Sequence, residues 1–269
     1  MLEQTPPPQN WLILRGLARE QRHWGPFIEI FEAKVPGSRV HTLDLPGVGT
    51  ECDRESPVTV AGIVGDMRER LAALRALHPG GWGLLGVSLG GMVTMEWGRL
   101  HPEDFARLVV INSSAADVNG PLRRLNARIL PDMLRAMVDP DPVERERRIL
   151  NFTSALIQEK EVVARQAAEF ARDAPIRRRN ALKQLLAAAT FRAPGALPVP
   201  TLVLGAGGDA MVAPSCAWHL AKRLNAPLHM HPTAGHELTL DDPEWVAHQV
   251  ASWCRTSQDD ASVVAASSR

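Results

Sequence analysis

A serine stands between two glycines at the point where an apolar run gives way to a helical one. The pentapeptide Gly86-Val87-Ser88-Leu89-Gly90 has the pattern G-x-S-x-G, follows the apolar run GLLGV and precedes the helical run MVTMEWGRL. Glycines at the flanking positions let a strand and a helix approach closely, so that a sharp turn presents the serine hydroxyl. At the start of a helix, the Leu89 amide would be free to stabilise an oxyanion. The pattern predicts Ser88 as a nucleophile and Leu89 as an oxyanion-hole donor, although a glycine-rich turn with an uninvolved serine has the same letters.

Two later residues complete the set that a nucleophilic serine needs. Asp209 follows the apolar run TLVLGA through two glycines, and His236 follows Gly235, after the last apolar run of the core. In such sites a histidine takes the serine proton and a carboxylate orients the histidine. We predict His236 as the general base and Asp209 as the orienting carboxylate. Taken alone, Asp209 is equally typical of a turn or helix cap.

Composition excludes several kinds of partner. Lys plus Arg and Asp plus Glu both number 30 among 269 residues, so no net charge attracts nucleic acid, and no nucleic-acid partner is expected. Three widely spaced cysteines predict reduced structural thiols. His229 and His231 share a strand face, but no third ligand lies nearby, so neither a metal nor another cofactor is expected. Residues 1–10 lack the apolar core of a signal peptide, and no run approaches the roughly 18 apolar residues of a membrane span, so we expect a cytoplasmic protein.

Short apolar runs alternate with helical stretches along the chain, which predicts an α/β fold with a parallel sheet. The helical period is clear over 63–77, where apolar residues recur on one face. The strands are expected at 11–15, 39–43, 83–87, 107–111, 201–204 and 228–231.

A long segment between the fourth and fifth strands has helical patterns broken by prolines and no strand signal. We therefore expect a core of residues 11–114 and 196–254, a helical cap of residues 115–195, and flexible termini at 1–10 and 255–269. The cap carries more basic than acidic residues. Arg123, Arg124 and Arg128 could favour an anionic substrate at the entrance, but ordinary solvated charges are the favoured interpretation.

From Trp11 to about Cys254 the chain resembles the α/β-hydrolase superfamily. The resemblance lies in the G-x-S-x-G pentapeptide, in the chain order serine, aspartate, histidine, and in the run DLPGVG at 44–49, which resembles the family's DxPGxG loop. Arg15-Gly16 stands where the family has His-Gly. In length and layout the chain is similar to small cap-bearing serine esterases such as the pimeloyl-carrier methyl ester esterases. The resemblance implies an α/β-hydrolase fold with a six-stranded, all-parallel sheet that lacks the family's two leading strands.

The resemblance also implies further site residues. Leu17 would supply the second oxyanion-hole amide. Arg15, in place of the usual histidine, either ties down this loop by hydrogen bonds or brings positive charge to the entrance. The substrate pocket would be lined by Gly16, Trp24 and Met92, with Phe27 beside Trp24.

The implied activity is that of a carboxylesterase-type serine hydrolase, which cleaves a small or medium acyl ester through an acyl-enzyme on Ser88. Thioester hydrolysis, C–C bond hydrolysis and lyase chemistry on the same residues stay open, as does a non-catalytic ligand-binding role. The expected partner is a small-molecule acyl ester, and an acyl carrier is the less favoured alternative.

Overall fold

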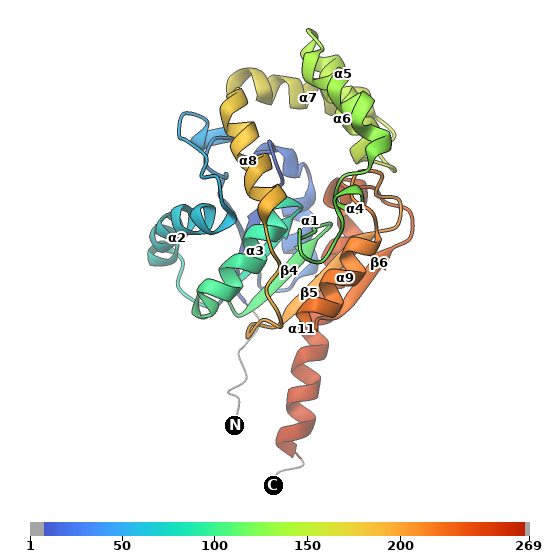
Figure 1. The fold of residues 1–269 in the computed structure, drawn as a ribbon. Helices are drawn as coiled ribbons and strands as arrows, with labels where there is room; N and C mark the ends of the chain where they lie inside the picture. The colour runs from blue at the N-terminus through green and yellow to red at the C-terminus, as the bar shows by residue number, and fades with distance from the viewer. Residues whose placement is uncertain (1–7, 267–269) are drawn as a thin grey trace.

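The computed structural model describes residues 8–266, and a six-stranded sheet lies at its centre (Figure 1). The strands are β1 (Asn10–Leu14), β2 (Arg39–Thr42), β3 (Trp82–Val87), β4 (Arg107–Ile111), β5 (Thr201–Ala206) and β6 (Leu228–His231). Their order is β2-β1-β3-β4-β5-β6, and every neighbouring pair is parallel. The expected α/β fold with an all-parallel sheet is confirmed, and each strand ends within two residues of its expected position.

Alternate residues of the strands face two separate hydrophobic layers. In β1, Trp11 and Ile13 belong to one buried cluster, while Leu12 and Leu14 belong to the other. All five residues of this strand are buried, as parallel strands are when helices cover both faces of the sheet. The sheet is therefore the middle of three layers.

Helices of the described residues form the two outer layers (Figure 1). The Trp11 side of the sheet packs against α1 (Phe27–Lys34) and α11 (Pro243–Ala266). The Leu12 side packs against α2 (Val60–Leu77), α3 (Leu89–Leu100) and α9 (Ser215–Leu224). Shorter helices in the connections are η1 (Gln21–Trp24), η2 (Gly49–Glu51), η3 (Pro102–Asp104) and α10 (Leu238–Asp241).

The helix expected over 63–77 begins three residues earlier than its apolar period indicates. Thr59 is its N-cap, and the threonine hydroxyl accepts a hydrogen bond from Gly62 N at 3.1 Å. This contact satisfies an amide that has no acceptor within the helix. The N-cap therefore sets the start of α2.

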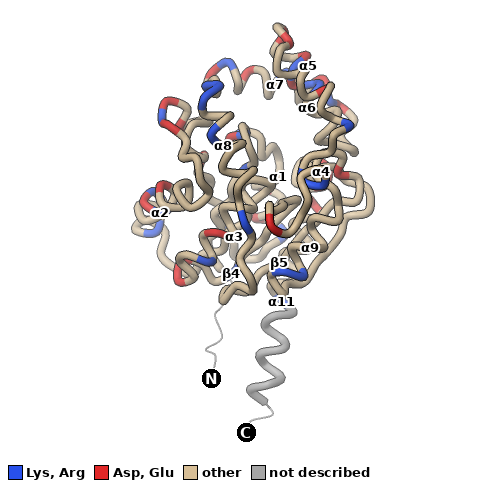
Figure 2. Tube along the Cα trace, viewed as in Figure 1, with Lys and Arg blue, Asp and Glu red and all other residues tan. Residues whose placement is uncertain are grey.

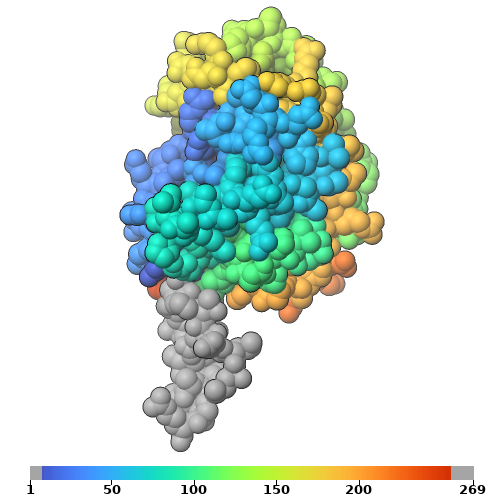
Figure 3. All heavy atoms as spheres, turned by 90° about the vertical axis from the view of Figure 1, so that its left-hand side faces the viewer, coloured from blue at the N-terminus to red at the C-terminus, as the bar shows by residue number. Residues whose placement is uncertain are grey.

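The segment between β4 and β5 is helical and lies over one end of the sheet (Figure 1). It contains α4 (Pro121–Arg124), η4 (Ala127–Ile129), α5 (Leu130–Val138), α6 (Pro142–Thr153), α7 (Lys160–Asp173) and α8 (Arg178–Thr190). Prolines stand in the first turns of α4, α5 and α6, where no amide hydrogen is required. Figure 3 shows the yellow part of this cap next to the light-blue loop that follows β2.

The helix α11 continues to Ala266, into the segment 255–269 that was expected to be flexible. That flexibility stays a prediction, and residues 267–269 lie outside the described residues. Neither glycine nor proline occurs after Pro243, so nothing in the chain interrupts the helical backbone once α11 has begun. The other expected flexible segment, 1–10, falls mainly outside the described residues, and β1 begins at Asn10. Among residues 8–266 no helix has the length and apolar content that crossing a membrane requires.

Candidate active site

Ser88 occupies a strained turn between β3 and α3. Its φ of 55° and ψ of −113° lie in a region that residues other than glycine rarely adopt. A Cβ atom at Gly86 would lie 2.1 Å from the Gly90 carbonyl oxygen, and one at Gly90 would lie 2.4 Å from the Leu14 carbonyl oxygen. Only glycine fits at both positions, which is the physical reason for the G-x-S-x-G pattern.

The backbone around Ser88 is held on both sides. Ser88 N–H donates to the Ile111 carbonyl at 2.9 Å, and the Ser113 hydroxyl donates to the Ser88 carbonyl at 2.9 Å. Because α3 begins at Leu89, the amide of that residue lies in the first turn, where helical amides have no acceptor within the helix. The placement of Leu89 suits an oxyanion-hole donor.

Asp209 and His236 lie together in the interior, each on a loop that follows a strand. His236 Nδ1 and Asp209 Oδ2 are 2.7 Å apart, and both side chains are buried. The second oxygen of Asp209 accepts the amides of Met211 at 2.9 Å and Val212 at 2.8 Å. The carboxylate thus serves at once as a turn acceptor and as the partner of the histidine. With Nδ1 engaged, Nε2 is the ring nitrogen that remains to accept a proton.

Close packing of two loops holds this pair. A Cβ atom at Gly207 would lie 2.4 Å from the Pro232 carbonyl oxygen, and one at Gly208 would lie 2.3 Å from the Thr233 carbonyl oxygen. The loop before Asp209 therefore packs directly against the loop before His236. The two glycines are what allow the carboxylate to reach the imidazole.

The charges around His236 favour its protonated form. Burial lowers the pKa of His236, but the charge and hydrogen bond of Asp209 and the charge of Glu237 outweigh burial and a smaller opposing effect of Arg15. The pKa of His236 therefore lies above its ordinary value of 6.5. A histidine of this kind is a strong proton acceptor once it is neutral.

Two residues that the sequence did not single out hold the loop of His236. Asn112, at the end of β4, donates from Nδ2 to the carbonyls of Gly235 at 3.2 Å and His236 at 2.9 Å. Asn112 has a φ of 45°, a conformation that asparagine tolerates better than most residues. Asp241 Oδ2 accepts the Gly235 amide at 2.6 Å. A polar residue directly after a buried strand was the one available signal for Asn112.

The segment after β1 lies against Ser88. A Cβ atom at Gly16 would lie 3.2 Å from Ser88 Cβ and 3.7 Å from Ser88 Oγ. Leu17 follows immediately and is half-buried. Met92 lies one turn along α3, where its amide donates to the Ser88 carbonyl at 3.1 Å, and its side chain is 6% exposed. Gly16 thus adjoins the hydroxyl directly, and Leu17 is the next residue along this segment.

Trp24 and Phe27 are buried in the core, and their place beside the substrate stays a prediction. Their side chains are 1% and 0% exposed and belong to the hydrophobic cluster on the Trp11 side of the sheet. The two rings stack with centroids 5.4 Å apart. Sequence could not decide this point, because an aromatic residue near a site and one in the core give the same local signal.

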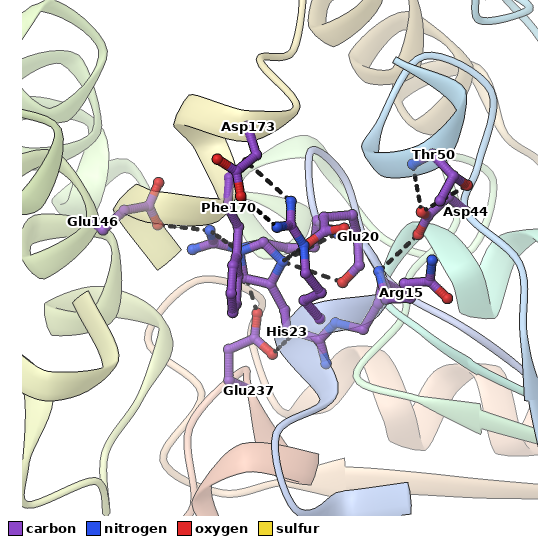
Figure 4. Close-up of polar contacts among 12 residues, drawn as sticks. Arg15, Glu20, His23, Asp44, Thr50, Glu146, Phe170, Asp173 and Glu237 are labelled. Atoms are coloured by element: carbon purple, nitrogen blue, oxygen red, sulfur yellow. Dashed lines mark hydrogen bonds and ion pairs between the residues drawn. The ribbon is translucent and has the colours of Figure 1, made fainter. Parts of the chain in front are cut away.

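Arg15 ties the loop after β1 to the loop of His236 (Figure 4). Its guanidinium forms a buried ion pair with Glu237, donates to Thr239 Oγ1 at 3.2 Å, and lies 4.7 Å from the ring centroid of Trp24. Arg15 is only 4% exposed. The structure therefore favours the interpretation that Arg15 anchors the loop, and it does not place a free positive charge at the entrance.

Glu237 lies between two arginines and connects the site with the cap. Arg19 Nε is 3.9 Å from Glu237 Oε1, and Arg19 also pairs with Glu146 of α6 at 2.7 Å. Burial raises the pKa of Glu237, but Arg15, Arg19 and His236 outweigh burial and bring it to about 2. Burial, with help from both arginines, lowers the pKa of His23 to about 2. At neutral pH Glu237 is therefore charged and His23 is neutral.

The three cap arginines do not form a common outward patch. Arg124 donates to the carbonyls of Ala188 and, at 2.8 Å, Ala189. These carbonyls belong to the last turn of α8, where the helix dipole favours a nearby cation. Arg123 and Arg128 are exposed, and Figure 2 shows both signs of charge over the cap. The hypothesis of an arginine cluster at the entrance is thus wrong for Arg124.

No metal-binding cluster is evident in the part of the chain that the structure describes: nowhere do three His, Cys, Asp or Glu side chains gather in a suitable arrangement. His231, one of the two strand histidines, accepts the Ala234 amide through Nδ1 at 2.8 Å, and its Nε2 lies 3.2 Å from Asp242. Both of its ring nitrogens are therefore engaged within the protein.

Fold and site together define the class of protein. The chain belongs to the α/β-hydrolase fold family, whose model matches residues 12–243. The chain is 29% identical over 230 residues to the putative carbamate hydrolase RutD of Yersinia enterocolitica, an alignment that covers 82% of this chain and 78% of that protein. It is 30% identical over 110 residues to the biotin biosynthesis bifunctional protein BioHC of Teredinibacter turnerae, which covers 40% of this chain and only 18% of that longer protein.

Solved structures agree on the fold. The putative non-heme bromoperoxidase BpoC of Mycobacterium tuberculosis superposes with a TM-score of 0.70 over 92% of both chains, at 23% identity. At this identity the likeness concerns the fold and not the reaction. The reaction has to be argued from the site.

Proposed function

We propose that this protein is a serine hydrolase that cleaves a carboxylic ester of a small or medium acyl group through an acyl-enzyme on Ser88. The observation that carries the proposal is the buried His236–Asp209 pair, 2.7 Å apart, in a fold that also presents Ser88 on a strained turn. A buried imidazole with an oriented Nδ1 and a free Nε2 is the arrangement that activates a serine hydroxyl.

In the proposed reaction, Ser88 Oγ attacks the ester carbonyl while His236 Nε2 takes the hydroxyl proton. The Leu17 and Leu89 amides stabilise the oxyanion, and Gly16 and Met92 border the acyl group. The tetrahedral intermediate collapses as His236 returns the proton to the leaving alcohol. Water then attacks the acyl-enzyme, His236 takes a proton from the water, and the carboxylic acid leaves as Ser88 regains its proton.

A second candidate function is the hydrolysis of a carbamate. The relative that aligns with 82% of this chain is named a putative carbamate hydrolase. The same groups would act on a carbamate carbonyl, with an amine or alcohol as the leaving group. Thioester and C–C bond cleavage use the same residues as well, so the bond that is broken has to be decided by substrate.

A substrate panel tests the proposal. Acyl esters of graded chain length, matched thioesters and matched carbamates are assayed with the wild type and with Ser88→Ala, and both proteins are treated with a fluorophosphonate probe. We expect ester turnover and covalent labelling in the wild type and neither in Ser88→Ala. A wild type that binds acyl compounds but takes up no label would be a non-catalytic member of the family. Carbamate turnover in large excess over ester turnover would favour the second candidate.

The pH dependence of ester turnover provides a further prediction. His236 must be neutral to accept the serine proton, and its surroundings raise its pKa above 6.5. Turnover of a neutral ester is therefore expected to fall as pH drops, with an apparent pKa above 6.5. kcat/KM measured from pH 5 to 9 would report this value for the free enzyme. A flat profile between pH 5 and 8 would rule out His236 as the base.

A further inference from the structure

Gln184 connects the cap with the segment that carries Leu17. It lies on α8, is fully buried, and makes two hydrogen bonds to the backbone of the core. Its Oε1 accepts the Ala18 amide at 3.0 Å, and its Nε2 donates to the Pro46 carbonyl at 3.2 Å. The two bonds join the loops after β1 and β2 to one side chain of the cap.

The turn that Gln184 contacts has an unfavourable backbone. Gly16 O accepts the Arg19 amide at 3.3 Å, which closes a four-residue turn over Gly16, Leu17, Ala18 and Arg19. Ala18, the third residue, has a φ of 59°. A positive φ at this position is typical of a type II turn and favours glycine, and it is strained for an alanine because of its Cβ atom.

An unfavourable conformation persists only where neighbouring groups hold it. Rotation of the Leu17–Ala18 peptide would convert the turn to type I and relieve the strain at Ala18. That rotation turns the Ala18 amide away from Gln184 Oε1 and leaves a buried acceptor without a donor, which is unfavourable because the oxygen has no water to replace the lost bond. The contact with Gln184 therefore opposes the relaxation of the turn.

We propose that Gln184 is a positioning residue that keeps the turn of residues 16–19 in the conformation required for catalysis. The inference rests on the proposed function, because the turn bears Leu17, the proposed second oxyanion-hole donor. The cap would then do more than cover the site: a side chain of α8 would hold part of the machinery that faces Ser88.

Asn180 provides a matched control on the same helix. It lies one turn before Gln184, is also fully buried, and also makes two hydrogen bonds to core backbone. Its Oδ1 accepts the Ser56 amide at 3.1 Å, and its Nδ2 donates to the Arg54 carbonyl at 2.9 Å. These partners belong to the loop after β2 and not to the turn of residues 16–19. Loss of Asn180 should therefore destabilise the interface of α8 with the core without releasing that turn.

The experiment compares Gln184→Leu, Gln184→Glu and Asn180→Leu with the wild type, using kcat and KM for a neutral ester and the midpoint of urea unfolding. Removal of one oxyanion-hole donor costs roughly 10²–10³-fold in kcat, so a displaced donor should cost Gln184→Leu about 10–100-fold in kcat with little change in KM. Gln184→Glu keeps an acceptor for the Ala18 amide and should retain more activity. Asn180→Leu should lower the unfolding midpoint as much as Gln184→Leu does, because it also removes two buried hydrogen bonds. It should leave kcat within about threefold, because neither bond reaches the turn of residues 16–19.

Hydrogen exchange at the Ala18 amide gives a readout that does not require activity. The exchange rate should rise in Gln184→Leu and stay unchanged in Asn180→Leu. Equal losses of kcat in Gln184→Leu and Asn180→Leu, or an unchanged exchange rate at Ala18 in Gln184→Leu, would overturn the role of Gln184. Failure of the proposed function has a different signature, because the wild type itself would then show neither ester turnover nor fluorophosphonate labelling.

Discussion

Ser88→Ala and His236→Ala are each expected to lower kcat for the preferred ester by roughly 10⁴–10⁶-fold, because nucleophile and base act as one unit. For the same reason the double variant should be scarcely worse than either single one. Steady-state kinetics, corrected for the rate measured without enzyme, would give the residual rates. Ser56→Ala, which alters a buried serine on the loop after β2, is the control and should remain near wild-type activity.

Asp209→Asn should lower kcat by about 10⁴-fold for a different reason. The asparagine oxygen can still accept the amides of Met211 and Val212, so its NH₂ group would point at His236 Nδ1. Nδ1 then becomes an acceptor, the proton moves to Nε2, and Nε2 can no longer take the proton of Ser88. Near wild-type turnover of this variant would mean that another carboxylate orients the histidine.

Glu237→Gln is expected to produce the largest loss of stability, about 3–5 kcal/mol in the free energy of unfolding, because it leaves buried arginine charge unpaired. Arg15 is 4% exposed and forms its ion pair with Glu237, and Arg19 lies beside the same carboxylate. Urea unfolding at pH 7 would measure the change. The control is Asp173→Asn, which breaks the exposed Arg22–Asp173 pair and should cost about 0–1 kcal/mol.

The pH dependence of this effect has a definite sign. Glu237 has a pKa of about 2 in the folded protein against an ordinary value of 4.5. Its contribution is therefore complete above about pH 4.5 and is lost as pH falls toward 2, so the gap between wild type and Glu237→Gln should narrow over that interval. The variant should also shift the acid limb of ester turnover to lower pH, because the charge of Glu237 raises the pKa of His236. A loss of stability no larger than that of Asp173→Asn would contradict a structural role for the Arg15–Glu237 pair.

The strands and the turn of Ser88 could be predicted from the sequence. The strands were expected from short runs that alternate with helical stretches, and these runs are strongly apolar in β1, β3, β4 and β5. The position of Ser88 follows from Gly86 and Gly90, whose missing side chains let β3 and α3 meet. Asp209 and His236 could be found because each stands in a glycine-containing loop after a strand of a parallel sheet. Each of these patterns spans only a few residues, because strand propensity, turn chemistry and steric fit act between near neighbours in the chain.

The residues that hold the site in place could not be predicted from such local patterns. Arg15 and Glu237 are 222 positions apart in the chain, and Ala18 and Gln184 are 166 apart. An arginine looks the same in the sequence whether it is buried beside a partner or exposed without one. The same holds for a glutamine, whether it faces solvent or a strained turn. Sequence was enough to predict the residues that we propose for the chemistry, since their types and glycine neighbours are local properties. Only the folded chain decided which groups hold them, because burial and pairing arise when distant segments pack together.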